Sequence, residues 1–406
     1  IDSNEKIGNA LKWIAKILER AKIPYEITGG FAACVYGSQR SINDIDIDIP
    51  EDRFDDILPD VKDYIAYGPA QFKDEKWDLK LMTLNYKGQE IDIGGAYETK
   101  IYDDTSKIWK KCLTNLSTVR TMNYEDIEMP VVDPGDLIEY KKFLVDPKFP
   151  QQENDIESVS RYIGKESLSC FYARLKELIS RNKFDLIIGA GDSGQVMAWI
   201  TREIFKALDT EIPQIVVLPI YRHADEAETI LFNNNIFTKE LRSKTDLSKV
   251  KQILFVDDEV GNGTVVSAVA GLIQNGADDN EERTITILSE NRGYNPPIKI
   301  AGNTVYFVPS RNVEANIYNA IQYVVPKILR MKTKDALKDL VEYPSEKLAL
   351  NVLLGLSIKK FNDCDPIFSD QYYIIMKDRI EDFEPTRIAF EAELKSSIYA
   401  LKEKRR

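Results

Sequence analysis

The chain has 406 residues, 43% of them hydrophobic and 30% charged, a composition typical of a soluble globular protein with two or three domains. Its net charge of −12 argues against broad electrostatic binding to nucleic acid but allows a local basic groove, and no apolar run is long enough to span a membrane. The four cysteines are far apart and form no disulfide or zinc pattern, so we expect a protein of the reducing cytoplasm. A homo-oligomer is compatible with these properties.

The first part of the chain predicts an α+β domain over residues 1–164. Apolar residues at helical spacing indicate a helix from about Asn4 to Ala21. The strand "YEITGG" then runs into a glycine turn, which is followed by the helix "FAACVYG" and the strand "DIDIDIP". A hairpin at Lys87-Gly88 is expected to join "LKLMTLNYK" to "QEIDIGG". The polar loop "VDPKFPQQEN" leads to the helix "DIESVSRYIG", and we place a domain boundary near Gly164.

Residues 165–330 predict a second domain with a different pattern of strands and helices. An amphipathic helix, "LSCFYARLKELISR", is followed by the apolar strands "FDLIIGAG", "QIVVLPI", "QILFVDDE", "RTITILS" and "NTVYFV", with helices between several of them. Continuous apolar strands that alternate with helices indicate an α/β fold with a doubly wound parallel sheet. Residues 331–406 predict a mostly helical extension with no assignable chemistry.

A first candidate site begins with three aspartates at alternate positions of one strand, Asp44, Asp46 and Asp48. Alternate side chains of a strand share a face, so these carboxylates repel one another unless a cation neutralises them. A solvated acidic edge strand would also explain the alternation. The glycine pair upstream and Asp92 on a later strand favour a site for Mg²⁺-dependent phosphoryl transfer instead.

The run from Gly29-Gly30 through Arg40 to Asp44-Ile-Asp46 resembles DNA polymerase β-like nucleotidyltransferases, especially the minimal and AbiEii-like groups of bacterial toxin and defence systems. The similarity covers about Asn4 to Gly164. It implies three catalytic Mg²⁺ ligands, Asp44, Asp46 and Asp92, and a nucleoside triphosphate held by Gly29, Gly30, Ser38, Arg40 and Lys141 (or Lys142 in place of Lys141). Asp48 departs from the family's pattern, which leaves open which two of the three aspartates bind metal.

A second candidate site is "ILFVDDEVGNGTV", where a buried strand ends in Asp257-Asp258 and a glycine loop leads into a helix. Open parallel sheets bind ligands at the carboxyl ends of their strands, and free amides at a glycine loop bind phosphate. The two carboxylates suit vicinal hydroxyls, so a ribose with a 5′-phosphate would satisfy both halves. Turn geometry alone is the plainer explanation of the glycines.

This stretch resembles the 5-phosphoribosyl-1-pyrophosphate (PRPP) loop of type I phosphoribosyltransferases, and the similarity covers about Ser167 to Pro326. Asn262 and Val265 depart from the family's usual threonine or serine. His223 is more often a solvated residue than an acid or base at such a place. The resemblance implies catalytic Asp257 and Asp258 at the ribose hydroxyls, Gly261, Asn262, Gly263 and Thr264 at the 5′-phosphate, a pyrophosphate loop of Ala190, Gly191, Asp192, Ser193 and Gly194, and Arg222 on a mobile loop.

Together the two resemblances predict a bifunctional Mg²⁺-dependent transferase that acts on a nucleoside triphosphate and PRPP. Two alternatives stay open: a PRPP- or nucleotide-binding regulator, and a toxin or defence nucleotidyltransferase that modifies RNA or protein. The sequence does not identify the acceptors, the preferred triphosphate, the coupling of the domains or the oligomeric state.

Overall fold

The structure is a computed structural model that describes residues 3–112, 114–146, 150–218, 220, 237–239, 241–257, 264–277, 281–289, 298–300, 303–309 and 384–403. The chain divides into two compact units, Ile1–Tyr162 and Ile163–Arg406. In the part of the chain described, no helix is both long and apolar enough to cross a membrane.

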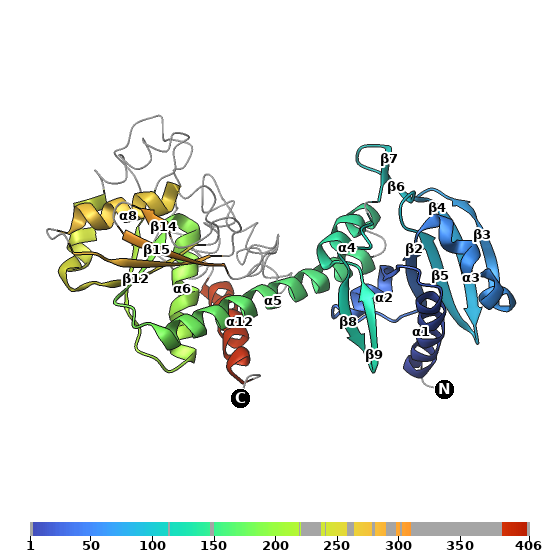
Figure 1. Cartoon of the computed structure of the whole chain (residues 1–406), viewed down its shortest axis with the longest axis horizontal. Coiled ribbons are helices and arrows are strands. Elements are labelled where there is room, and N and C mark those ends of the chain that lie inside the picture. Colours follow the sequence, from blue (N-terminus) through green and yellow to red (C-terminus); the bar gives the residue numbers. More distant parts are fainter. Residues whose placement is uncertain are drawn as a thin grey trace. The chain divides into compact units, whose positions relative to one another are not determined.

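The first unit is built on a mixed sheet with the strand order β7-β6-β4-β5-β2-β1-β9-β8, and β3 pairs with the outer side of β4 (Figure 1). The parallel pairs β2·β5 and β1·β9 lie in the middle, and antiparallel pairs lie on both sides. Its strands are β1 (Glu26–Ile27), β2 (Asp44–Ile49), β3 (Ile65–Lys73), β4 (Trp77–Tyr86), β5 (Gln89–Gly95), β6 (Lys100–Asp103), β7 (Ile108–Lys111), β8 (Arg120–Tyr124) and β9 (Ile127–Val131).

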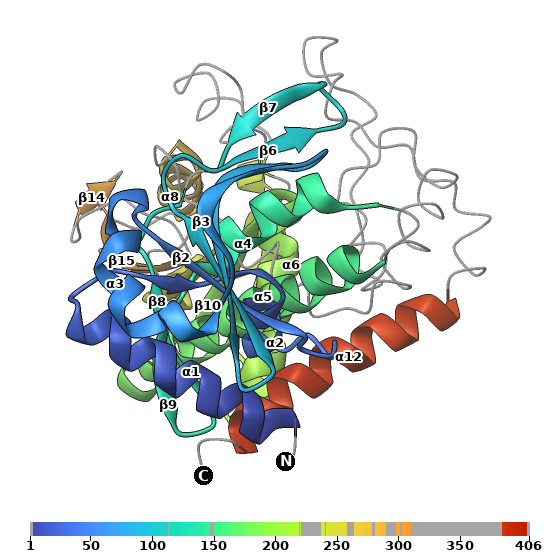
Figure 2. The ribbon, with the colours of Figure 1, turned by 90° about the vertical axis from the view of Figure 1, so that its right-hand side faces the viewer.

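One face of this sheet carries the core. The isoleucines of β2 and β5 are fully buried and alternate with the acidic residues of the same strands. Helix α1 (Ser3–Arg20) packs on β5 and β9 and against α3 (Phe54–Val61). Figure 2 shows α1 beside α3 and β9. The short helix α2 (Gly29–Val35) contacts β2, and α4 (Pro134–Lys141) contacts α2. The acidic residues therefore lie on the sheet face opposite the apolar core.

Local patterns predicted much of this unit correctly. The first helix, the strand "DIDIDI" and the β4–β5 hairpin are confirmed, and the hairpin turn uses positive φ angles at Lys87 (50°) and Gly88 (84°). The helix α5 is one helix of 31 residues, Gln151–Arg181, so it runs through Gly164, near which the sequence places a domain boundary, and it includes the end of the predicted loop. A single glycine costs a helix only about 1 kcal/mol, and good helix formers flank Gly164 on both sides.

The second unit contains a sheet with the order β11-β10-β12-β13-β15-β14, in which every pair is parallel except β14·β15. Strand order reverses between β10 and β12, since β11 lies on one side of β10 and all later strands lie on the other. The strands are β10 (Leu186–Ala190), β11 (Gln214–Leu218), β12 (Gln252–Val256), β13 (Thr284–Ser289), β14 (Ile298–Ile300) and β15 (Asn303–Pro309).

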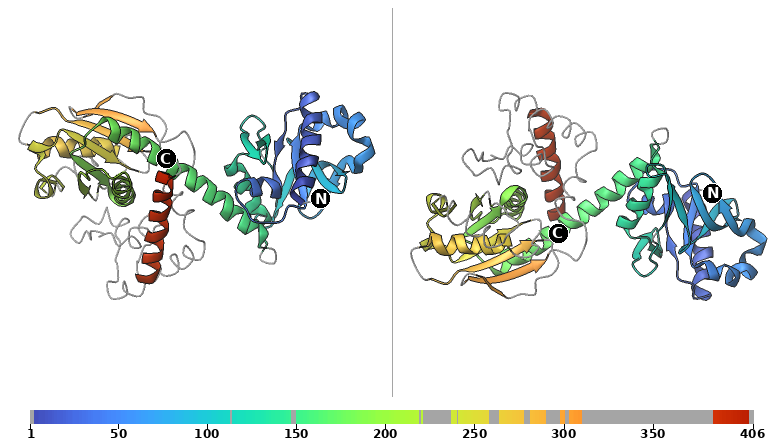
Figure 3. Two further views of the ribbon diagram at one scale, coloured as in Figure 1. Left: turned by 90° about the horizontal axis from the view of Figure 1, so that it is seen from below. Right: turned by 90° about the horizontal axis from the view of Figure 1, so that it is seen from above.

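Apolar side chains of this sheet enter two separate clusters, one on each face. Residues of α6 (Gly191–Ala207) and α12 (Glu384–Glu403) pack with Ile187 and Leu254 on one face, and residues of α8 (Thr264–Gly276) pack with Ile188 and Phe255 on the other (Figure 3). The chain is thus a mixed α/β protein with a helical C-terminal end.

Candidate active site on two acidic strands

Strands β2 and β5 place four acidic residues in two facing pairs. Their parallel pairing sets Asp44 beside Glu90 and Asp46 beside Asp92. The remaining aspartate of β2, Asp48, pairs with Gly94 on this side and with Glu26 of β1 on the other. The alternation read from the sequence therefore becomes a two-stranded block of carboxylates once β5 is aligned with β2.

Three of these residues bring carboxylate oxygens together. Ligand atoms of Asp44, Glu90 and Asp92 all lie within 4.8 Å of one another. Asp44 and Asp92 are half-buried and Glu90 is exposed, so the cluster is open to solvent on the Glu90 side. The Thr83 hydroxyl donates a hydrogen bond of 2.6 Å to Asp92 Oδ1, which orients that carboxylate. An all-oxygen donor set with these spacings fits Mg²⁺ or Mn²⁺.

The glycine pair holds Asp46 by a backbone hydrogen bond. The Gly30 N–H donates to Asp46 Oδ2 over 3.1 Å. Gly29 has φ of +65°, and a Cβ atom there would lie 1.8 Å from the same oxygen. A Cβ atom on Gly30 would lie 2.8 Å from the Arg40 guanidinium. Gly29 thus requires glycine because of its positive φ and the nearby Asp46, whereas a side chain at Gly30 would displace the Arg40 guanidinium.

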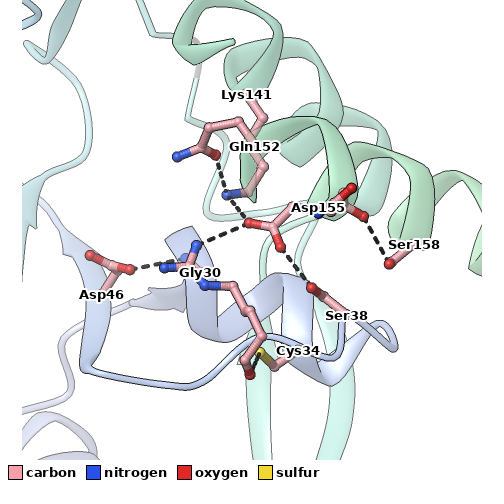
Figure 4. A network of polar contacts seen from close by, with 10 residues as sticks. Gly30, Cys34, Ser38, Asp46, Lys141, Gln152, Asp155 and Ser158 are labelled. Atoms are coloured by element: carbon pink, nitrogen blue, oxygen red, sulfur yellow. Dashed lines mark hydrogen bonds and ion pairs between the residues drawn. The ribbon is translucent and has the colours of Figure 1, made fainter. Parts of the chain in front are cut away.

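A second network surrounds Asp155, which is fully buried near the start of α5 (Figure 4). Its Oδ1 accepts a 2.7 Å hydrogen bond from the Ser38 hydroxyl, and its Oδ2 accepts from Arg40 Nη1 at 3.1 Å and from Lys141 Nζ at 2.9 Å. Lys141 also donates to Gln152 Oε1 at 2.9 Å. One carboxylate and two cations leave this network with one net positive charge next to the glycine turn.

The three residues expected from the sequence to bind the triphosphate with the glycines, Ser38, Arg40 and Lys141, are brought together by Asp155. Lys141 is 1% exposed, and its ammonium is enclosed by Asp155 and Gln152. The Arg40 side chain is 20% exposed. Arg40 therefore has the more accessible charge, while Lys141 fixes the position of Asp155.

Burial without a cation raises the pKa of several carboxyl groups in this region. Desolvation, then the charge of Asp44, raises the pKa of Asp46 to about 7, although the Gly30 N–H opposes the shift. Desolvation and neighbouring carboxylates raise the pKa of Asp48 to about 7 and that of Glu26 to about 8. Burial also raises the pKa of Asp92. A divalent cation would relieve this repulsion.

Asp48 lies apart from the carboxylate cluster. It accepts a side-chain hydrogen bond from Thr114, and a Cβ atom on Gly94 would lie 2.9 Å from its Oδ1. It is not a member of the Asp44–Glu90–Asp92 group. Among the described residues, Asp48 thus belongs with Glu26, and the geometry sets it aside from Asp44 and Asp46.

Sequence reasoning missed two residues, Glu90 and Asp155. Glu90 carried a signal, because "QEIDIGG" repeats the acidic alternation of "DIDIDI" and any parallel pairing of the two strands would bring Glu90 onto the same face. Asp155 had no such signal: it lies 115 residues from Arg40 in the sequence, and only the tertiary fold joins them.

The second predicted site is described in part. Ala190 ends β10, Gly191 begins α6 with φ of +63°, and Asp257, 4% exposed, follows β12. Since β10 and β12 are adjacent and parallel, these two strand ends lie at the same edge of the sheet. The backbone of Asp192 and Ser193 lies in α6, and Thr264 begins α8. Arg222, His223, Asp258, Gly261, Asn262 and Gly263 lie outside the described residues.

The β10–α6 turn is unusually tight. A Cβ atom on Gly189 would lie 2.2 Å from the Gly194 carbonyl oxygen, and a Cβ atom on Gly194 would lie 2.9 Å from the Gly189 carbonyl carbon. The helix therefore starts in close contact with the strand, and only glycines allow that approach.

No protein-family model and no curated protein sequence matches the chain. Similar solved structures are TM1012 of Thermotoga maritima, assigned as a nucleotidyltransferase (20% identity, TM-score 0.28, 34% of this chain and 84% of that one), the lincosamide antibiotic adenylyltransferase LnuA (15%, 0.26, 37% and 93%) and the antibiotic-resistance factor ANT(2″)-Ia (13%, 0.27, 37% and 83%). TM-scores this low support no inference about the chemistry of this chain, whose proposed function rests on the geometry of its own site.

Proposed function

We propose that residues 1–164 form a nucleotidyltransferase domain that transfers a nucleoside monophosphate from a nucleoside triphosphate to an acceptor hydroxyl. The observation that carries the proposal is the facing of two acidic strands, in which Asp44, Glu90 and Asp92 converge while the Gly30 N–H binds Asp46. A divalent cation such as Mg²⁺, held by Asp44, Asp46 and Asp92, would neutralise the triphosphate and polarise its α-phosphoryl group.

The chain's own groups then account for the remaining steps. The acceptor oxygen forms a bond to the α-phosphorus, the bond from that phosphorus to the bridging oxygen breaks, and pyrophosphate leaves. The proton of the acceptor hydroxyl passes to Asp92, whose Oδ1 is held by Thr83. Arg40, fixed by Asp155 beside Gly30, supplies positive charge for the departing phosphates.

A labelling experiment tests this proposal. The intact protein with Mg²⁺ and each α-³²P-labelled nucleoside triphosphate would be incubated with metabolite, tRNA and protein fractions. Label transferred by the unaltered protein and lost with Asp92→Asn supports the proposal, whereas no transfer with any nucleotide and fraction contradicts it. The fraction that takes up the label decides whether the domain acts on a small molecule, or on RNA or protein as a toxin or defence enzyme would.

We further propose that residues 165–330 bind PRPP and transfer its phosphoribosyl group, which would make the protein a bifunctional transferase with a helical extension over residues 331–406. The support is the reversal of strand order between β10 and β12, where open parallel sheets hold their ligands. The glycine turn at Gly191 and the buried Asp257 lie at the carboxyl ends of those two strands, as a phosphate and a ribose would require.

Calorimetric titration of PRPP with Mg²⁺ into the intact protein tests this second activity. Micromolar binding that is lost with Asp257→Asn/Asp258→Asn supports a PRPP site, and the absence of binding contradicts it. Binding without any acceptor-dependent release of pyrophosphate would favour a PRPP- or nucleotide-responsive regulator over an enzyme.

A further inference from the structure

The sheet face that carries the carboxylates continues past them as an apolar surface. Asp92 of β5 pairs with Asp46 of β2 on one side and with Thr83 of β4 on the other, and Thr83 pairs in turn with Tyr67 of β3. Residues paired across strands share a face of the sheet. The next pairs along β3 and β4 are apolar, and with Tyr67 they form what we call the β3–β4 surface, which consists of Tyr67, Ala70, Phe72, Leu79 and Leu81.

We propose that the β3–β4 surface binds the acceptor of the nucleotidyl group, and that this acceptor is a small, uncharged hydroxyl compound with an apolar ring. This inference rests on the proposed nucleotidyltransferase function and specifies the acceptor that the function leaves open. Tyr67 determines the specificity, because it lies in the same row of paired residues as Asp92.

The position of the acceptor follows from the direction of the reaction. The Gly30 N–H and Arg40 lie on the β2 side of Asp92, next to Asp46, and Arg40 supplies positive charge for the departing phosphates in the proposed reaction. An in-line displacement brings the attacking oxygen to the phosphorus from the side opposite the leaving oxygen. Strand β5 separates β2 from β4. The acceptor whose hydroxyl gives its proton to Asp92 therefore approaches over β4 and β3.

The charged side chains that alternate with the β3–β4 surface belong to the other face of the sheet. Lys73 donates to Asp78 at 3.0 Å, and Lys80 donates to the Glu51 carbonyl at 2.8 Å and lies over the Phe54 ring. All five residues of the β3–β4 surface are uncharged. RNA needs cations for its phosphates, and none of these five side chains supplies one. An apolar ring, by contrast, gains contact with aromatic and aliphatic side chains.

Tyr67 is exposed and held in place, as a residue that contacts a ligand should be. It is 41% exposed, and its ring meets that of Phe72 edge to face, with centroids 6.2 Å apart and an interplanar angle of 87°. Its hydroxyl donates to the Gln71 carbonyl at 3.4 Å. The register of β3 against β4 shifts on both sides of Tyr67, and such irregularities often direct a side chain beside an active site.

Transfer to two alcohols that differ by one ring tests the proposal on the full chain. The protein would be incubated with Mg²⁺, an α-³²P-labelled nucleoside triphosphate and either benzyl alcohol or methanol. We expect the unaltered protein to favour benzyl alcohol at least tenfold in kcat/KM, and Tyr67→Ser to lower this preference to less than threefold. Tyr67→Phe retains the ring and should retain the preference. The KM for the nucleotide should stay within twofold in both variants, because only the acceptor side is changed.

Tyr399→Ser is the matched control, because Tyr399 is 42% exposed and lies on α12 of the other unit. It should leave the preference unchanged. A preference that the unaltered protein lacks, or that survives in Tyr67→Ser, overturns the proposal, and so does label that enters tRNA rather than either alcohol. Should Tyr67→Ser not fold, as judged by circular dichroism, Tyr67→Leu keeps an apolar side chain without the ring. We then expect a three- to fivefold loss of preference, and an unchanged preference contradicts the proposal.

Saturation-transfer NMR of benzyl alcohol without nucleotide separates binding from catalysis. Saturation of the ring protons by the unaltered protein and by Tyr399→Ser, lost with Tyr67→Ser, supports the acceptor surface. The absence of that signal with the unaltered protein contradicts the surface even if nucleotide is transferred to another acceptor, in which case the proposed function stands. Benzyl alcohol that binds through Tyr67, with no transfer to any acceptor, contradicts the proposed function and with it the role of the surface in transfer.

Discussion

Two carboxylate sites in the first unit differ in how their negative charge is balanced. Asp155 has two cations, Arg40 and Lys141, and a hydroxyl within hydrogen-bonding distance. The carboxylates of β2 and β5 face one another, with a threonine and a glycine N–H as hydrogen-bond donors to Asp92 and Asp46. A charge that is balanced within the fold supports the scaffold, whereas repulsion left unbalanced by the chain marks a place for a ligand of opposite charge.

Substituting one carboxylate at each site tests most strongly whether the two sites have different roles. The change Asp92→Asn should have the largest effect on activity. We expect nucleotidyl transfer to fall by about 10³-fold, since both a metal ligand and the proton acceptor are lost. The free energy of unfolding should stay the same or rise, because one member of a repelling group is removed. Initial rates and urea unfolding measure the two effects, with Asp52→Asn, an exposed aspartate just after β2, as the control.

The same change at Asp155 should act mainly on stability. Asp155→Asn leaves Arg40 and the buried Lys141 without their common anion, and breaking a buried ion pair costs about 3–5 kcal/mol. Urea unfolding measures the loss. The surface pair Lys142–Glu139 supplies the contrast, since Glu139→Gln should change stability by less than about 0.5 kcal/mol. Similar losses for both variants would contradict the structural role of Asp155.

The glycine turn between the two groups can be tested with a matched pair of substitutions. Gly29→Ala and Gly37→Ala both place a side chain at a positive φ, but only the new Cβ atom at Gly29 would collide with Asp46. We expect about 1 kcal/mol of strain at Gly37 and about 2–3 kcal/mol at Gly29, with weakened Mn²⁺ binding for Gly29→Ala alone. Equal Mn²⁺ affinities for the two variants would show that the turn does not position Asp46.

The pH dependence of stability should also reveal the carboxyl groups whose repulsion the chain leaves unbalanced. Asp46, Asp48 and Glu26 have folded pKa values of about 7, 7 and 8, above their ordinary values of 3.8 and 4.5. The folded state therefore holds protons that the unfolded chain has released, and raising the pH favours unfolding. Without metal, we expect the free energy of unfolding to fall by several kcal/mol between pH 6 and pH 8, since a group that titrates fully contributes about 1.4 kcal/mol per pH unit.

Thermal and urea unfolding at several pH values in this range, with a chelator and then with Mg²⁺, measure that fall. Asp48→Asn should flatten the profile, and Mg²⁺ should raise stability most at the upper end of the range. A metal-free protein that becomes more stable as the pH rises from 6 to 8 would show that these carboxyl groups are not held in their protonated form.

The sequence by itself determined the elements that follow from local periodicity. The alternation in "DIDIDI" set the strand and its acidic face, and apolar residues at helical spacing set α1. It also led to the prediction of Asp44, Asp46 and Asp92 as candidate metal ligands, through the row of alternating carboxylates and the resemblance to nucleotidyltransferases. In the first unit, the strands β3 and β6 to β9 were not predicted. The last four have only four or five residues, and strands of that length show little alternation and gain their stability from pairing.

Only the tertiary structure decided which charges meet. The register of β2 against β5 set Glu90 beside Asp44 and placed Asp48 with Glu26, and a shift of one residue would have reversed every face. Long-range packing brought Asp155 to Arg40 across 115 residues of sequence. Local patterns report the type and direction of a side chain, whereas its charge partners depend on distances that the fold alone defines.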